Sequence, residues 1–183
     1  MIVLGINASA RKNGNCQALL DEALKTAKEA GCVVEAVCLI DLNISPWNEV
    51  NPKDDMEKLI SKIKDADVII LASPIYFGSL SAQAKIMIDR CQALWEEVIL
   101  NKKHIRKSPI MAGLILTEAS DRKDFFENAE QIARNFFAVI EAKHKASLRC
   151  SGLEDKTDVL SKPDYLEKAR LLAKTLISQG SRS

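Results

Sequence analysis

The chain has 183 residues, of which 47% are hydrophobic and 28% are charged, and its net charge is +1. These values are typical of a single globular domain over residues 1–183, and they favour neither nucleic acid nor an anionic membrane as a partner. No apolar run approaches the roughly 20 residues of a membrane helix, and the sequence opens in a strand-like run rather than a signal peptide. We therefore expect a soluble, cytoplasmic protein.

The cysteines and histidines do not form a recognisable metal or disulfide pattern. The five cysteines are odd in number, none is spaced as C-x-x-C, and there are only two histidines. Cysteines in this setting are typically small buried hydrophobic residues, and we expect most of these to be so. They are Cys16, Cys32, Cys38, Cys91 and Cys150.

Strands and helices are predicted to alternate along the chain. Strands are expected at 2–6, 33–39, 68–72, 109–117 and 143–148. Helices are expected at 15–30, from 54, from 81, at 125–140, and from 163, where a proline opens the last one. Residues 42–53 are expected to be irregular, and the segment SPIYFGSLS to be a loop. Asp54 and Glu57 have the spacing of a capping box.

This alternation predicts an α/β fold with a doubly wound, five-stranded parallel sheet. The continuous apolar runs at 68–72 and 109–117 are typical of strands buried on both faces. Right-handed crossovers favour the strand order 2-1-3-4-5, with the short, lysine-bearing fifth strand at an edge. Ligands in such sheets bind beyond the carboxyl ends of strands one and three, where the order reverses.

The loop after the first strand, GINASARKNGNC, has the composition of a phosphate site. It has no acidic residue, and it precedes a helix whose first N–H groups have no intrahelical partner. We expect Gly14 to adopt an unusual backbone angle here. The candidate phosphate ligands are Ser9, Arg11, Lys12, Asn13, Asn15 and Cys16. The alternatives are that Arg11 and Lys12 are solvated, and that Asn15 caps the helix.

The loop after the third strand lies beside this site in the predicted topology. Its proline stiffens the backbone, its glycine permits close approach, and its two aromatic residues offer flat apolar faces. A ligand with a phosphate tail and a planar ring suits the pair of loops, and FMN has both. The candidate ring-binding residues are Pro74, Ile75, Tyr76, Phe77 and Gly78. The alternative is that Tyr76 and Phe77 are core or interface aromatics.

Residues 1–91 also resemble a known family. GINASARKNGNC is similar to the phosphate loop of flavodoxin-fold NAD(P)H-dependent FMN reductases, and DADVIILASPIYFGSLSAQAKIMIDR to their second flavin loop and helix. The resemblance is greatest to the iron–sulfur flavoprotein branch. It implies a flavodoxin-like fold, bound FMN, NADH or NADPH as the co-substrate, and a homodimer or homotetramer.

The sequence departs from that family in three places. The iron–sulfur branch carries clustered cysteines between the second strand and the second helix, whereas residues 42–53 here contain none, so we expect no iron–sulfur cluster. Cys16 stands where the family has threonine, and its weaker hydrogen bonding predicts a loss of roughly 1 kcal/mol in phosphate binding. The segment TEASDRKD lacks the family's glycines and places Glu118 and Asp121 near an anionic ligand.

Three functions are compatible with these features. The first is an FMN-dependent oxidoreductase that passes electrons from NAD(P)H, or from a carrier protein, to a small acceptor such as a quinone or a flavin. The second is a flavodoxin-type electron carrier, which the net charge of +1 disfavours because such carriers are commonly acidic. The third is a flavodoxin-fold binding module without redox activity.

Some residues outside the two loops are interpreted structurally. Lys85 and Asp89 have the i, i+4 spacing of a helical ion pair, and Asp89 and Arg90 are expected to be structural rather than catalytic. Trp47 either covers the flavin or a neighbouring subunit, or packs on its own domain. The apolar segment 94–100 belongs either to the core or, as we favour, to a subunit interface.

Overall fold

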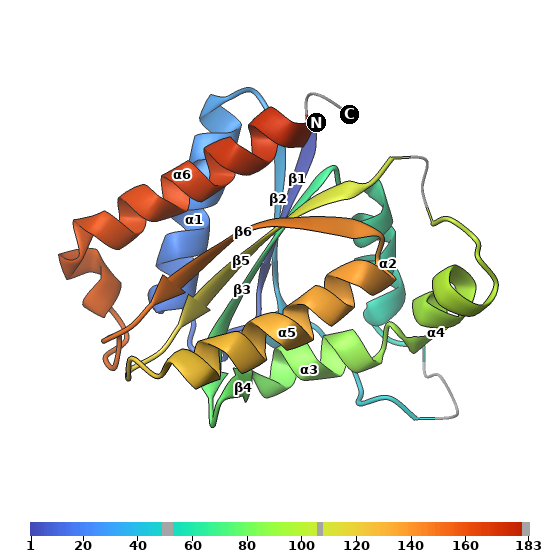
Figure 1. Ribbon diagram of the computed structural model, residues 1–183, viewed down its shortest axis with the longest axis horizontal. Coiled ribbons are helices and arrows are strands. Elements are labelled where there is room, and N and C mark those ends of the chain that lie inside the picture. Colours follow the sequence, from blue (N-terminus) through green and yellow to red (C-terminus); the bar gives the residue numbers. More distant parts are fainter. Residues whose placement is uncertain (49–52, 106–107, 181–183) are drawn as a thin grey trace.

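The computed structural model describes residues 1–48, 53–105 and 108–180, and it is built around one twisted sheet (Figure 1). Five parallel strands pair in the order β2-β1-β3-β5-β6. Counted along the chain without the short β4, this is the predicted order 2-1-3-4-5, which is therefore confirmed. The strands are β1 (Ile2–Asn7), β2 (Val33–Cys38), β3 (Val68–Tyr76), β4 (Ser79–Leu80), β5 (Ile110–Thr117) and β6 (Ala142–Cys150).

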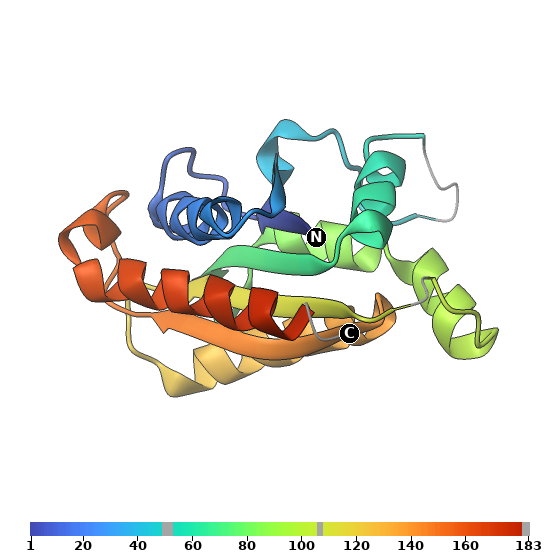
Figure 2. The same cartoon turned by 90° about the horizontal axis from the view of Figure 1, so that it is seen from above.

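Helices cover both faces of the sheet (Figures 1 and 2). Helices α1 and α6 share one apolar core with the sheet, and α2, α3, α4 and α5 share the other. The helices are α1 (Asn15–Glu29), α2 (Met56–Asp65), α3 (Ala82–Asp89), α4 (Gln92–Trp95), α5 (Lys123–Val139) and α6 (Pro163–Gly180). Three single turns complete the fold, at Leu39–Asp41, Glu96–Leu100 and Asp158–Ser161. None of the described helices is both long and apolar enough to cross a membrane.

The central strands β3 and β5 are buried on both faces, as their continuous apolar runs predicted. Successive residues point to opposite faces: Ile69 and Leu71 join the core under α5, whereas Val68 and Ile70 join the core under α1 and α6. Strand β6 pairs with β5 alone among the described strands, so its predicted place at an edge is confirmed.

The predicted loop SPIYFGSLS is wrong, because the third strand continues to Tyr76 and Ser79–Leu80 forms a further short strand. Strand β3 keeps pairing with β5 as far as Pro74 opposite Thr117, while its pairing with β1 ends at Ala72. Proline is tolerated there because one side of the strand has become an edge. The chain then turns back at Phe77 and Gly78, and Tyr76 pairs antiparallel with Ser79 of β4.

Other predicted details differ locally from the structure. Helix α2 begins at Met56 rather than Asp54, and its N-cap Asp55 makes no side-chain capping bond, so the predicted capping box is wrong. Strand β6 extends beyond the predicted 143–148 at both ends, because its pairing with β5 continues to Cys150 opposite Thr117. Helix α3 begins after Ser81 as predicted, since the Ser81 hydroxyl accepts a hydrogen bond from the Ala84 N–H.

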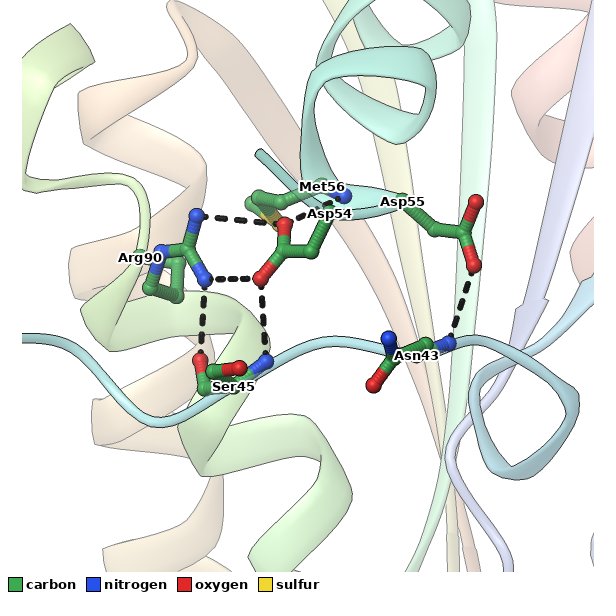
Figure 3. A network of polar contacts seen from close by, with 6 residues as sticks. All are labelled: Asn43, Ser45, Asp54, Asp55, Met56 and Arg90. Atoms are coloured by element: carbon green, nitrogen blue, oxygen red, sulfur yellow. Dashed lines mark hydrogen bonds and ion pairs between the residues drawn. The ribbon is translucent and has the colours of Figure 1, made fainter. Parts of the chain in front are cut away.

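A buried ion pair holds the segment that precedes α2 (Figure 3). Asp54 and Arg90 lie 2.5 Å apart, and their side chains are 2% and 3% exposed. Arg90 also donates to the Ser45 carbonyl, and Asp54 accepts from the backbone N–H groups of Ser45 and Met56. This arrangement supports the predicted structural role of Arg90. The described part of the irregular segment, 42–48 and 53, contains no helix or strand, whereas residues 49–52 lie outside the described chain.

Candidate functional site

The loop after β1 is shaped by a short chain of hydrogen bonds. The side-chain oxygen of Asn7 accepts a hydrogen bond from the Ser9 N–H at 3.0 Å. The Ser9 hydroxyl in turn accepts a hydrogen bond from the Arg11 N–H at 3.1 Å. The expected unusual angle belongs to Asn13, with φ 54°, and not to Gly14, whose φ is −93°. Glycine suits position 14 because the space is tight: a Cβ there would lie 3.0 Å from the Arg11 carbonyl oxygen.

Helix α1 begins directly at this loop. Its N-cap is Gly14, which has no side chain to cap the helix, so the alternative in which Asn15 caps the helix is wrong. Asn15 instead joins the helix to the chain after β6, because it donates to the Asp155 carbonyl at 2.7 Å and accepts from the Val159 N–H at 3.0 Å. The first turn has no acidic residue, and its N–H groups are oriented to attract an anion.

The hairpin of β3 and β4 is tied to the same loop through Ser81. Its hydroxyl donates to the Ala8 carbonyl at 2.6 Å, and its backbone N–H donates to the Ser73 hydroxyl at 3.1 Å. Both serines are fully buried. At the tip, Asn128 of α5 donates to the Gly78 carbonyl at 2.6 Å. The two predicted ligand loops are therefore adjacent and fixed relative to each other.

A cavity of 270 Å³ opens between these loops at the carboxyl edge of the sheet. Four segments line it: the loop after β1 with the start of α1, the end of β3, the β5–α5 connection, and the chain after β6. The lining residues are Ser9, Arg11, Asn15, Cys16, Pro74, Ile75, Tyr76, Thr117, Glu118, Ala119, Ser120, Leu153, Glu154 and Lys156.

A larger hollow of 660 Å³ lies at the opposite edge, near His104 and Lys143, where β5 and β6 begin. We place the functional site at the carboxyl edge, because ligands of open α/β sheets bind there, at the reversal of strand order. The β1–β3 neighbourhood is that reversal.

The cavity brings together many of the predicted site residues but not all of them. Ser9, Arg11, Asn15, Cys16, Pro74, Ile75 and Tyr76 line it. Lys12 points elsewhere, to Asp41 at 2.5 Å, and this partner raises the pKa of Lys12. Asn13, Phe77 and Gly78 are not lining residues. Phe77 stands fully exposed at the hairpin tip, beside Tyr76, which is 42% exposed.

Two further segments line the cavity, and the sequence pointed to only one of them. Thr117, at the end of β5, and the next three residues, Glu118, Ala119 and Ser120, belong to the segment TEASDRKD, which was expected near the ligand. The second segment, Leu153, Glu154 and Lys156 after β6, was not expected there. The second segment is held close because Arg11 donates to the Glu154 carbonyl at 3.0 Å. The predicted strand order could have indicated this segment, because β6 runs parallel to β5 and the loop that follows it therefore lies at the same edge of the sheet. Asp121, expected beside the ligand, is exposed and outside the lining.

Cys16 is a protonated thiol in the wall of the cavity. It is 2% exposed, and its sulfur lies 3.1 Å from the Thr117 hydroxyl. Burial raises the pKa of the Cys16 thiol to about 12, despite the opposing effect of Thr117. The thiol therefore carries no negative charge at neutral pH that would repel a phosphate.

The chemistry of these walls fits FMN. The α1 N-terminus and Arg11 suit the phosphate, Tyr76 presents a half-exposed aromatic side chain, and the Glu118 carboxylate has a buried oxygen without a partner among the described residues. The volume is slightly below the about 300 Å³ at which small-molecule sites usually begin, so part of a mononucleotide would extend through the open mouth. Among the described residues, no group of His, Cys, Asp or Glu is arranged to hold a metal ion.

Known proteins share both the fold and the sequence pattern. The flavodoxin-like fold is also found in RosB, solved with bound 8-demethyl-8-formylriboflavin-5′-phosphate, with a TM-score of 0.80, 17% identity, and coverage of 100% of this chain and 79% of RosB. An NAD(P)H:quinone oxidoreductase from Methanothermobacter marburgensis superposes with a TM-score of 0.72 at 17% identity, over 96% of this chain and 98% of that one.

The sequence comparisons extend the likeness beyond the fold. An iron-sulfur flavoprotein of Methanocaldococcus jannaschii is 34% identical over 148 residues, which are 76% of this chain and 72% of that protein. The family model of NADPH-dependent FMN reductases matches residues 1–144. The chain belongs to the NADPH-dependent FMN reductase family, and it is an NAD(P)H-dependent oxidoreductase containing FMN.

Proposed function

We propose that this protein takes a hydride from NADH or NADPH and delivers the electrons, through FMN held in the carboxyl-edge cavity, to a small acceptor such as a quinone or a flavin. The observation that supports this most is that the α1 N-terminus and the half-exposed side chain of Tyr76 line the same cavity. An NAD(P)H:quinone oxidoreductase of the same fold supports the acceptor class.

Each wall of the cavity has a separate task in this proposal. FMN supplies the redox chemistry when bound, because its N5 atom accepts a hydride. Arg11 and the first N–H groups of α1 hold the phosphate, and the Ser9 hydroxyl fixes the backbone of Arg11. Tyr76, at the end of β3 and 42% exposed, would pack against the flavin ring.

The test begins with the visible spectrum and with NADH or NADPH oxidation by the FMN-loaded protein, with a quinone as the acceptor. Arg11→Ala removes a charge-assisted bond of about 1.5–3 kcal/mol, and we expect the Kd for FMN to rise about 10- to 150-fold. Lys12→Ala is the matched control, because Lys12 pairs with Asp41 outside the cavity. A protein that neither takes up FMN nor oxidises a nicotinamide would refute the proposal.

We also propose a homodimer or homotetramer, as the family resemblance implied. Leu94 is part of the core, so the interface predicted for 94–100 does not include it, but Ile99 and Leu100 are 47% and 60% exposed. Trp47, 53% exposed, lies near the start of the same segment, where it lines a shallow hollow with Gln92 and Glu96. An apolar surface of this kind supports contact with a second copy.

A further inference from the structure

Glu118 is the most constrained charged residue in the cavity wall. It follows β5 directly, and only 7% of it is exposed. Its backbone is fixed on both sides, since its N–H donates to the Cys150 carbonyl at 2.9 Å and its carbonyl accepts from the Leu153 N–H at 3.0 Å. The side chain therefore projects from a rigid position.

The two oxygens of this carboxylate have different surroundings. Oε1 accepts a hydrogen bond from the Ser120 hydroxyl at 2.7 Å. Oε2 is buried and has no hydrogen-bond partner within the described chain. A buried acceptor left without a donor is destabilising, and more so when it belongs to a charged group. An oxygen retained in this state at a ligand cavity indicates a donor that arrives with the ligand.

The two ends of FMN differ in what they offer such an acceptor. The phosphate has no N–H to donate and is repelled by a carboxylate, whereas the flavin ring carries an imide N–H. Arg11 and the start of α1 line the cavity together with Glu118 and account for the phosphate. The phosphate therefore cannot supply the missing donor, which leaves the imide N–H of the ring and the hydroxyls of the ribityl chain. Of these, a contact with the ring is the one that would act directly on the reduction potential.

We propose that Glu118 accepts a hydrogen bond from the imide N–H of the flavin and thereby lowers the reduction potential of the bound FMN. This inference rests on the proposed function, since it needs FMN in the cavity. Reduction adds two electrons to the ring, and a fixed negative charge beside it opposes that gain. The opposition is strong because the carboxylate is screened little by water in this buried position. Glu118 thus makes the reduced flavin a stronger electron donor to the acceptor.

The test compares Glu118→Gln with Asp121→Asn. Glutamine keeps the size of the side chain and an acceptor oxygen for Ser120, but it removes the charge. Asp121→Asn removes the same charge from the same connection after β5, but Asp121 is exposed and outside the cavity lining, so water screens it. The measurement is the midpoint potential of bound FMN, obtained by anaerobic reduction against reference dyes, together with the Kd for oxidised FMN.

For Glu118→Gln we expect at least a tenfold gain in affinity for reduced over oxidised FMN, which is a rise of about 30 mV for a two-electron couple. Asp121→Asn should leave the potential near that of the unaltered protein. An unchanged potential in Glu118→Gln, with FMN bound and the fold intact by circular dichroism, would overturn the inference, as would equal weakening of both redox forms. Failure of the unaltered protein to bind FMN would instead refute the proposed function.

Discussion

Asp54 couples the stability of the protein to acidic pH. Arg90, which hydrogen-bonds its carboxylate, is the main cause that lowers the pKa of Asp54 from 3.8 to about 2. A carboxyl group whose pKa is lower in the folded state stabilises the fold above its unfolded pKa, and this contribution disappears as the pH falls through the folded pKa. We expect the pair to contribute about 2 kcal/mol that is lost between pH 4 and pH 2, measurable by urea unfolding across this range.

Asp54→Asn should destabilise the protein by about 1.5–3 kcal/mol at pH 7, because it weakens the buried charge-assisted hydrogen bonds between Asp54 and Arg90. Asp55→Asn is the control, since the neighbouring Asp55 is 30% exposed and pairs with the solvated Lys58. Similar losses of unfolding free energy in both variants would contradict the assigned role of the buried pair.

The cysteines should differ sharply in their reactivity. Burial raises the pKa of the Cys16, Cys91 and Cys150 thiols to about 12 in each case, whereas Cys32 and Cys38 are partly exposed. Because the thiolate is the reactive form, iodoacetamide at pH 8 should label only the latter two in the folded protein. Mass spectrometry of the labelled peptides checks this, and unfolded protein, in which all five react, is the control. Rapid labelling of Cys16 would show that its position is not closed to solvent.

At the scale of single elements, the hairpin tip carries backbone strain. Phe77 and Gly78 both have positive φ, 51° and 76°, as a two-residue hairpin turn of the primed type requires. Asparagine tolerates this region better than phenylalanine does. We expect Phe77→Asn to raise the unfolding free energy by about 0.5–1 kcal/mol, because the exposed ring contributes no packing. A lower thermal midpoint would show that the ring has a partner in the assembled protein.

Gly78→Ala gives the opposite expectation at the neighbouring position. A Cβ would lie 2.9 Å from the Phe125 ring, at a φ that alanine rarely adopts. We expect a loss of more than about 1 kcal/mol by urea unfolding. The hairpin thus combines Gly78, which packing requires to be small, with Phe77, which adopts a backbone conformation that phenylalanine disfavours. Backbone strain of this kind is often associated with function.

The elements could be predicted from local patterns, but their exact ends could not. Period-two and continuous apolar runs located all five parallel strands. The extension of β3 through Pro74 depended on which partner strand stopped first, and no local pattern carries that information. The capping box failed for a similar reason, since Asp54 is committed to Arg90, a residue 36 positions away.

At the scale of the whole molecule, the site was predicted only where the sequence motif was continuous. Ser9, Arg11 and Tyr76 lie in two compact motifs, and the strand order placed these motifs side by side. Glu118 was expected near the ligand from the segment after β5, whereas Lys156 reaches the cavity only because β6 ends at the same edge of the sheet, so its place follows from the tertiary arrangement. Lys12 shows the converse, since its motif position suggested the phosphate while Asp41 lies within its reach.

Assembly is also tested at this scale. Leu100→Glu introduces a charge into the proposed interface, and we expect the dissociation constant of the assembly to rise at least tenfold by sedimentation. Leu171→Glu is the matched control, because Leu171 is 51% exposed on α6, on the other side of the sheet. Equal effects of both changes, or a monomeric unaltered protein, would count against the proposed interface.

The hydrogen bond from Ser81 to Ala8 has a consequence for the lifetime of the loaded protein. It ties the loop after β1 to the hairpin of β3 and β4, so separating these two walls would break a buried hydrogen bond. Of the other two walls, the connection after β5 is held through the backbone of Glu118, and the chain after β6 is held by side-chain bonds from Arg11 and Asn15. We expect the residence time of FMN to follow the rate at which the chain after β6 opens. Asn15→Ala should therefore shorten this residence time, measured by stopped flow with an excess of a flavin-free apoprotein that traps the released FMN. The opening of a single wall segment is thus expected to limit the rate at which FMN is exchanged.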